Sequence, residues 1–170
     1  MSKTAELARD SIKVKGMFRV HIEEDGKIVG DSGWKQNLIT NAGHNQGIVM
    51  SLGGITGSSQ ITYAALGTGG APAQSATTLS GEVSTNGSGS VVRAAITAAS
   101  SSNSSALVNT ATFSSANSFI TATASISNIG LFQVSGPTTA SGSLYAGNTY
   151  TSSSLATNQN VNITYTLNFS

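Results

Sequence analysis

A strict two-residue alternation of apolar and polar side chains is the feature that most limits how this chain can fold. The alternation is clearest over residues 161–169, where Val, Ile, Tyr, Leu and Phe alternate with Asn and Thr, and it recurs over residues 12–23. Successive side chains of a strand point to opposite faces of a sheet, so the pattern predicts half-buried antiparallel strands. Repeated at short intervals, it predicts an all-β fold, an antiparallel β-sandwich or jelly-roll-like barrel of about seven to nine strands.

The 170 residues are predicted to form one domain preceded by a short arm. The arm covers residues 1–11 and the β-sandwich domain covers residues 12–170. Within the domain we expect a charged hairpin over residues 12–35, a short helix over residues 41–52 and neutral, Ser/Thr-rich strands over residues 61–170. The expected strands of this last part cover residues 61–66, 91–96, 106–113, 119–126, 129–134, 144–146 and 161–169, with loops over residues 98–105 and 136–142.

Several local signals support these elements. Asp25 and Gly26 are expected to turn the hairpin, because glycine supplies the positive φ that a tight turn needs, and Trp34 is expected to pack over it. Thr40 or Asn41 is expected to cap the helix. Ile48, Val49 and Leu52 should lie near one face of the helix. Gly43 and Gly47 weaken it, so it needs tertiary support. Gly130 is read as a possible bulge, and alanine-rich inner faces indicate a thin core.

Charge is distributed very unevenly along the chain. Thirteen of the fifteen charged residues lie at or before Lys35, and residues 94–170 contain none, whereas soluble surfaces carry roughly a quarter or more charged residues. Disordered low-complexity sequence would explain this composition, but the alternation and the many large apolar residues argue against it. An adventitiously neutral surface remains an alternative. We favour the interpretation that other subunits cover much of this surface, because exposed sheet edges normally carry charges that prevent pairing.

Glu82 and Arg93 are the two charged residues that follow Lys35. We expect them to form an ion pair between neighbouring segments. An exposed pair would contribute only about 0–1 kcal/mol. A buried pair would instead fix the register of the segments, and breaking it would cost about 3–5 kcal/mol.

The search for catalytic and metal-binding patterns is negative. The chain has no cysteine, hence no disulfide and no thiolate site. His21 and His44 lack ligand-like spacing; the first is expected to be solvated and the second to pack or cap. Residues 67–70 are rich in glycine but precede no Gly-Lys-Ser/Thr, so they are read as a turn and not as a phosphate loop. The chain is therefore expected to be no enzyme and to hold no cofactor and no metal.

Other function classes are also disfavoured by the sequence. The net charge of +1 gives no electrostatic footprint for nucleic acid. No apolar run approaches the roughly 18 residues of a membrane span, and the start lacks the hydrophobic core of a signal peptide. A sugar-binding platform is one further possibility, ordinary packing being the alternative. Its candidates are Tyr63, Tyr145, Tyr150 and Trp34, with Tyr150, in a predicted Ser/Thr-rich loop, the best of them.

Three motifs carry a resemblance to a known family. They are Asn37-Leu38-Ile39-Thr40-Asn41-Ala42-Gly43, then Tyr63-Ala64-Ala65-Leu66-Gly67-Thr68-Gly69 followed by Glu82 and Arg93, then Ile129-Gly130-Leu131-Phe132. This pattern, over roughly residues 17–170, resembles one common in small accessory virion proteins of tailed double-stranded DNA phages. The resemblance implies a virion structural protein without implying one place in the particle.

From this resemblance we expect a capsid decoration, or cement, protein on the outer capsid surface. It would be a homo-oligomer, a trimer by expectation, that bridges major capsid subunits through many weak contacts. Tail, neck or fibre components and a receptor-binding head domain that recognises glycans are the alternatives. No nucleic acid or membrane partner is expected. The residues expected to contact the capsid are Lys13, Lys15, Arg19, Lys27 and Trp34.

Overall fold

A computed structural model describes residues 12–56, 60–83, 93–100, 104–135 and 143–170. The described residues form ten strands, all paired antiparallel. Their bounds are β1 Val14–Glu24, β2 Lys27–Asp31, β3 Lys35–Ile39, β4 Tyr63–Gly67, β5 Ala94–Ala95, β6 Thr97–Ala99, β7 Ala106–Phe113, β8 Ala124–Phe132, β9 Leu144–Leu155 and β10 Asn160–Phe169. The strands follow one another in the order β5-β4-β8-β9-β3-β1-β10-β7-β6, and β2 pairs with β1.

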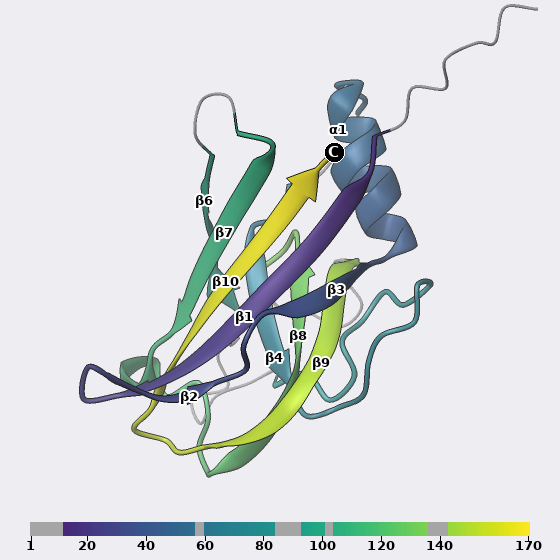
Figure 1. The fold of residues 1–170 in the computed structure, drawn as a ribbon. Helices are drawn as coiled ribbons and strands as arrows, with labels where there is room; N and C mark the ends of the chain where they lie inside the picture. Colours follow the sequence, from purple (N-terminus) through teal and green to yellow (C-terminus); the bar gives the residue numbers. More distant parts are fainter. Residues whose placement is uncertain (1–11, 57–59, 84–92, 101–103, 136–142) are drawn as a thin grey trace, which may run out of the picture.

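The sheet closes almost completely on itself. Its two end strands, β5 and β6, follow each other in the chain with only Ile96 between them. One layer consists of β2, β1, β10, β7 and β6, and the facing layer of β9, β8, β4 and β5, as Figure 1 shows. Strand β3 joins the two layers, because it pairs with β1 on one side and with β9 on the other. The prediction of an all-β sandwich or barrel is confirmed.

The first and last strands form the spine of this barrel. The β1 and β10 strands pair over ten residues, from Val14 opposite Phe169 to Glu23 opposite Asn160. The predicted alternation holds on both, with Phe18 and Tyr165 buried between the layers. Beyond the pairing, Lys13 and Ser170 exchange two backbone hydrogen bonds of 2.6 and 2.9 Å. The sheet therefore holds both ends of the described chain at one rim of the barrel.

The core is larger than the thin, alanine-rich core that the sequence suggested. Its largest fully buried side chains are aromatic, among them Tyr145, Tyr165, Phe18 and Phe132. The rings of Phe18 and Tyr150 meet edge to face across the two layers, with centroids 6.2 Å apart. The prediction placed Phe18 and Tyr165 on inward faces but put Tyr150 in a loop, so it missed the aromatic contact that spans the two layers.

The hairpin turn forms where it was predicted. Asp25 and Gly26 both have positive φ, 48° and 74°, which matches the tight turns that join antiparallel strands. Trp34, however, does not pack over the hairpin, because 49% of its surface is exposed. Ile12, predicted on the buried face, is 72% exposed, since the pairing of β1 with β10 begins only at Val14.

The predicted helix is present but is wound differently. It comprises η1, a π-helix over Gly43–Val49, followed by α1, Met50–Leu52. As predicted, Thr40 caps its start, since the Thr40 hydroxyl accepts a 3.2 Å hydrogen bond from the Gly43 amide. The π winding changes which side chains face the barrel. Val49 and Leu52 are 59% and 78% exposed, so neither side chain is buried against the barrel.

Tyr145 of β9 gives this helix tertiary support. Gly43 lies directly against the backbone carbonyl of Tyr145, where a Cβ atom would overlap the carbonyl oxygen. One turn later Gly47 faces the Tyr145 ring, with room for a Cβ at 3.5 Å. The close approach at Gly43 explains why glycine is needed there despite its poor helix propensity.

Two predictions about the strand region 119–134 were wrong in detail. Residues 119–123 form no strand; a 3-10 turn over Ser115–Asn117 and a left-handed Ser118 redirect the chain, and β8 begins only at Ala124. The bulges of β8 flank Gly130, which itself pairs regularly with Ala65 and Gly147. A Cβ at Gly130 would lie 2.8 Å from Leu144 Cδ1, so packing and not a bulge requires this glycine.

Some predicted features are displaced or cannot be placed. Ala98 and Ala99, predicted in a loop, pair in β6 with Asn109 and Val108. The predicted turn over residues 136–142 and the start of the predicted strand at residues 91–92 lie outside the described residues.

Candidate interaction surface

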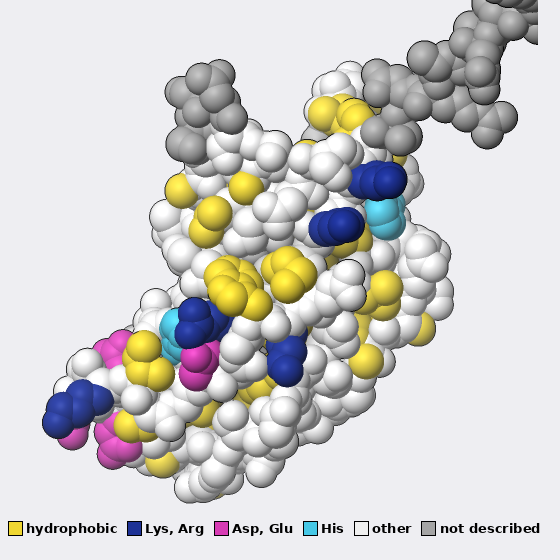
Figure 2. All heavy atoms as spheres, in the orientation of Figure 1, with side chains coloured by type: hydrophobic (Ala, Val, Ile, Leu, Met, Phe, Trp, Pro, Cys, Tyr) yellow, Lys and Arg dark blue, Asp and Glu magenta, His cyan; other side chains and the backbone are white. Residues whose placement is uncertain are grey.

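The charged residues form a stripe along β1 and its hairpin. On β1 the outward positions alternate with the buried ones, and they carry Lys15, Arg19, His21 and Glu23. Figure 2 shows the acidic side chains gathered at the hairpin end, the basic ones spread along β1, and a largely uncharged surface elsewhere on this face. The uneven charge of the sequence thus becomes one stripe on the molecule.

The centre of the stripe is an ion pair between the two strands of the hairpin. The Arg19 guanidinium donates hydrogen bonds of 2.9 and 2.6 Å to the two carboxylate oxygens of Asp31, and the Gly33 amide donates a third of 2.8 Å. These donors hold the pKa of Asp31 well below its usual range. His21 Nε2 lies 3.5 Å from the same carboxylate. Arg19 is therefore engaged within its own hairpin.

The turn end of the hairpin is fastened to the turn between β9 and β10. Glu24 accepts hydrogen bonds of 2.8 and 2.9 Å from the side-chain amides of Asn158 and Gln159, and the bond from Gln159 contributes most to lowering the pKa of Glu24. Glu23 accepts a 3.1 Å hydrogen bond from Asn162 on β10. Glu23 and Glu24 thus orient the hairpin through the hydrogen bonds that they accept.

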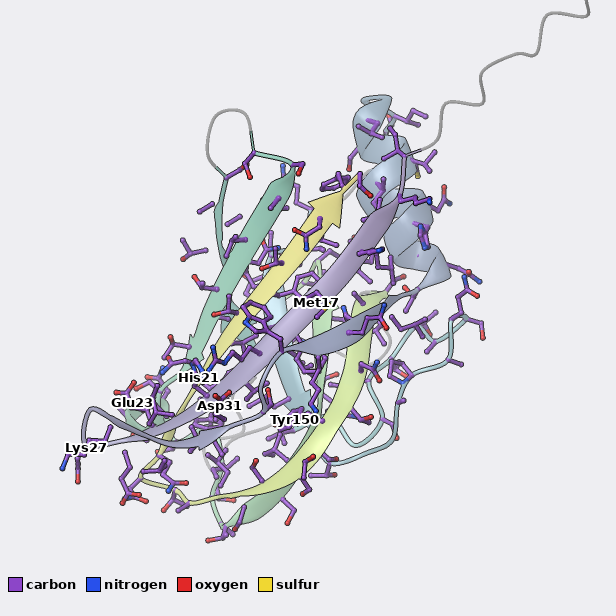
Figure 3. All side chains as sticks on the ribbon, in the orientation of Figure 1. Met17, His21, Glu23, Lys27, Asp31 and Tyr150 are labelled. Carbon is purple, nitrogen blue, oxygen red and sulfur yellow. The ribbon has the colours of Figure 1, made fainter. Side chains whose placement is uncertain are left out.

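The end of the hairpin exposes apolar side chains next to a basic one. Ile28 and Val29 are 62% and 55% exposed. Lys27 precedes them, and Figure 3 labels it at the far end of the hairpin. Val29 is the extra residue of a bulge, because Ile22 pairs with Gly30 and the next residue of β1 pairs with Ile28. A bulge re-aims side chains. We call Ile28 and Val29 the hairpin tip.

The five residues predicted to contact a partner do not converge on one point. Lys13 and Lys15 lie at the start of β1, Arg19 in its middle and Lys27 beyond its end, so the strand separates them by up to about 34 Å at its usual rise per residue. None of the ion pairs among the described residues involves the three lysines. The set can serve an extended contact and not a compact ligand site.

Glu82 and Arg93 meet in the opposite layer. The Arg93 guanidinium donates hydrogen bonds of 2.6 and 3.0 Å to the two oxygens of Glu82, and a third of 3.1 Å to the carbonyl of Val134. Only 4% of the Arg93 side chain and 10% of the Glu82 side chain are exposed. The pair connects the segment before β5 to the isolated bridge that Glu82 forms with Gly67, so its role is structural.

The aromatic residues considered for a sugar platform are dispersed. Tyr150 lies within β9, not in a loop, and is 8% exposed; burial raises the pKa of its hydroxyl. Tyr145 is fully buried, and Trp34 lies between β2 and β3. The prediction that Tyr150 lies in a loop was wrong. The Ser/Thr-rich run around it is a strand with its polar side chains outside.

The described residues contain no group of three or more His, Cys, Asp or Glu side chains that could hold a metal ion. His44 is exposed on the first turn of the helix and neither packs nor caps through its side chain. Within the same residues, no helix has the length and apolar character needed to cross a bilayer.

The sequence analysis missed an apolar groove between the helix and the strand ends. The groove has a volume of about 390 Å³ and opens to solvent. Ile48 and Leu52 form its helix side, and Leu107, Leu167 and Phe169 form its sheet side. Asn109 also lines it; the residue is 2% exposed and its amide nitrogen has no hydrogen-bond partner among the described residues. A polar residue at an inward position of β7 was the available signal.

Comparisons of this chain with protein families, with curated proteins and with solved structures find no match.

Proposed function

We propose that this chain is a non-enzymatic structural subunit of a tailed-phage virion, and that it serves as a capsid decoration protein. The observation that carries the proposal is the segregation of its surface: one charged stripe along β1, one exposed apolar hairpin tip, and uncharged strands elsewhere. The sequence resemblance to accessory virion proteins supports the same class. In this role the barrel sits on the capsid lattice as a homo-oligomer and bridges major capsid subunits.

The charged stripe is the surface proposed to face the capsid. Lys13, Lys15 and Lys27 are exposed and form no ion pair with another described residue, so we propose that they meet acidic groups of a partner. Arg19 and Trp34 lie between them along the stripe. Individual exposed pairs contribute only about 0–1 kcal/mol, so useful affinity arises from many copies binding at once.

Copy number in purified virions tests the proposal. A decoration protein is expected at hundreds of copies per particle, measured by quantitative mass spectrometry against the major capsid protein. A few to some tens of copies would assign the chain to the tail, neck or fibre instead. Absence from particles that package DNA normally would overturn the virion assignment altogether.

The stripe is tested separately with charge-reversed protein added to undecorated capsids. Lys15→Glu/Lys27→Glu protein should bind at least tenfold more weakly than the unmodified chain, and the affinity of the unmodified chain should fall as salt is raised. Ser125→Glu/Ser154→Glu protein is the matched control, since it adds charge at exposed positions of β8 and β9 away from the stripe. Equal loss in both variants would contradict the assignment of the stripe.

A further inference from the structure

The groove is built to receive an apolar segment that also offers a hydrogen-bond acceptor. Its walls are uncharged, and exposed Leu52 stands at its helix side. Among its lining residues, Asn109 holds a buried amide nitrogen that finds no acceptor among the described residues. Buried polar groups are normally paired, so this donor indicates that an acceptor enters the groove from outside.

The hairpin tip offers the complementary chemistry. Ile28 and Val29 are exposed apolar side chains. Among the described strands β2 pairs only with β1, so the backbone carbonyls on the outer edge of β2 are not engaged by another described strand. Such an edge is a template for binding another chain. The tip therefore carries both features that an occupant of the groove needs, apolar side chains and backbone acceptors.

The two surfaces lie at opposite ends of the same strand. Phe169, which lines the groove, pairs with Val14 at the start of β1, whereas the hairpin begins where β1 ends at Glu24. The strand spans about 34 Å at its usual rise. Figure 1 shows the helix beside the start of β1 and the hairpin at the far end. One molecule cannot bring its own tip to its own groove.

We propose that the hairpin tip of one copy docks in the groove of the next copy. The contact joins two different patches, so it is heterologous, and repeated contacts produce a closed ring or an open filament, depending on the rotation between copies. This deepens the proposed function by naming the surfaces through which the subunits assemble, and the self-association that it requires can be measured without a virion.

Two single substitutions at exposed sites test the contact in the purified full chain. Ile28→Asp places a charge on the tip, and Leu52→Asp places one at the groove; both side chains are exposed, so folding should be unaffected, as circular dichroism would show. By sedimentation velocity the unmodified chain should form oligomers, and each variant should associate at least tenfold more weakly. Ser125→Asp, at an exposed position of β8, is the matched control and should assemble normally.

Mixing the two variants gives the decisive result. The Leu52→Asp protein retains its tip and the Ile28→Asp protein retains its groove, so an equimolar mixture should form one-to-one dimers and nothing larger. A protein that carries both substitutions should bind neither of the single variants. A monomeric unmodified chain, unchanged assembly of the single variants, or a mixture without dimers would each overturn the proposal. High copy number in virions together with any of these results would leave the proposed function standing and remove only this contact.

Discussion

The guanidinium carbon of Arg93 lies 3.6 Å from the centroid of the Phe132 ring, while the guanidinium nitrogens hold both oxygens of Glu82. A planar guanidinium can stack on an aromatic face and pair with a carboxylate at the same time, which an ammonium group cannot do as well. The two charged residues that follow Lys35 thus neutralise each other on the side of the barrel formed by β4, β5 and β8.

Breaking this buried pair should destabilise the fold strongly. Arg93→Met leaves the Glu82 carboxylate, whose side chain is 10% exposed, without its partner, and we expect the free energy of unfolding to fall by about 3–5 kcal/mol. Glu82→Gln/Arg93→Met should lose less than the sum of the two single changes. Urea unfolding measures this. Arg19→Met, which breaks a solvent-exposed pair, should cost far less; equal losses at both sites would refute the structural role.

The two glycines of the helix should differ in their tolerance of a methyl group. Gly43→Ala forces the new Cβ into the carbonyl oxygen of Tyr145, so we expect a loss of about 1–3 kcal/mol. Gly47→Ala meets only the edge of the Tyr145 ring at 3.5 Å, so it should be neutral or stabilise by up to about 1 kcal/mol. Thermal unfolding of the two variants compares them directly, and equal effects would contradict the packing at Gly43.

Alkaline pH should destabilise the barrel through its buried tyrosines. Burial raises the pKa of Tyr165 from 10.0 to about 12 and raises that of Tyr150 as well. The folded state therefore holds these protons more tightly than the unfolded state does. This stability is complete below pH 10, the ordinary pKa, and is lost as the pH rises through the folded pKa.

Urea unfolding at increasing alkaline pH measures this loss. Tyr165→Phe removes one of the two titrating groups and should make the loss shallower. A free energy of unfolding that stays constant above pH 10 would show that these hydroxyls are not buried.

Acid should loosen the hairpin before it unfolds the barrel. Hydrogen bonds from Arg19 lower the pKa of Asp31 below its ordinary 3.8, and those from Gln159 and Asn158 lower the pKa of Glu24 below 4.5. Their contribution to stability is present above those ordinary values and is lost as the pH falls toward the folded pKa values. Hydrogen exchange of the hairpin amides should accelerate in this range. In Asp31→Asn protein the acceleration should be smaller, because one titrating group is gone.

The fold was predictable from the sequence wherever a strand has one solvent-exposed face and one buried face. Residues 161–169 and 14–23 alternate strictly, and the structure pairs them with each other. The hairpin turn and the extent of the helix were predictable for local reasons, positive φ at Gly26 and a cap at Thr40. Local chemistry alone determines such features, so no tertiary information is needed.

The sequence-based predictions failed where tertiary contacts decide the local structure. The inward face of β9 holds Tyr150, but its outward serines and threonines resemble a loop in sequence. The π winding over Gly43–Val49 was not predictable from the sequence, and Leu52 beyond it is 78% exposed. The groove could not be predicted, because it forms only when the helix, β7 and β10 come together and leave the amide of Asn109 unpaired.

The double pairing of β3 makes it a mechanical link. It holds β1 through three residue pairs, from Gly16 opposite Asn37 to Phe18 opposite Lys35, and β9 through only two, Leu38 opposite Gly147 and Ile39 opposite Ala146. A pulling force that separates the layers along this seam loads those two short ladders, and the ladder to β9 is extended by the Thr40 amide, which donates a 2.9 Å hydrogen bond to the Tyr145 carbonyl. In a stretched assembly the two layers would then separate along β3, while the long β1-β10 ladder remains intact.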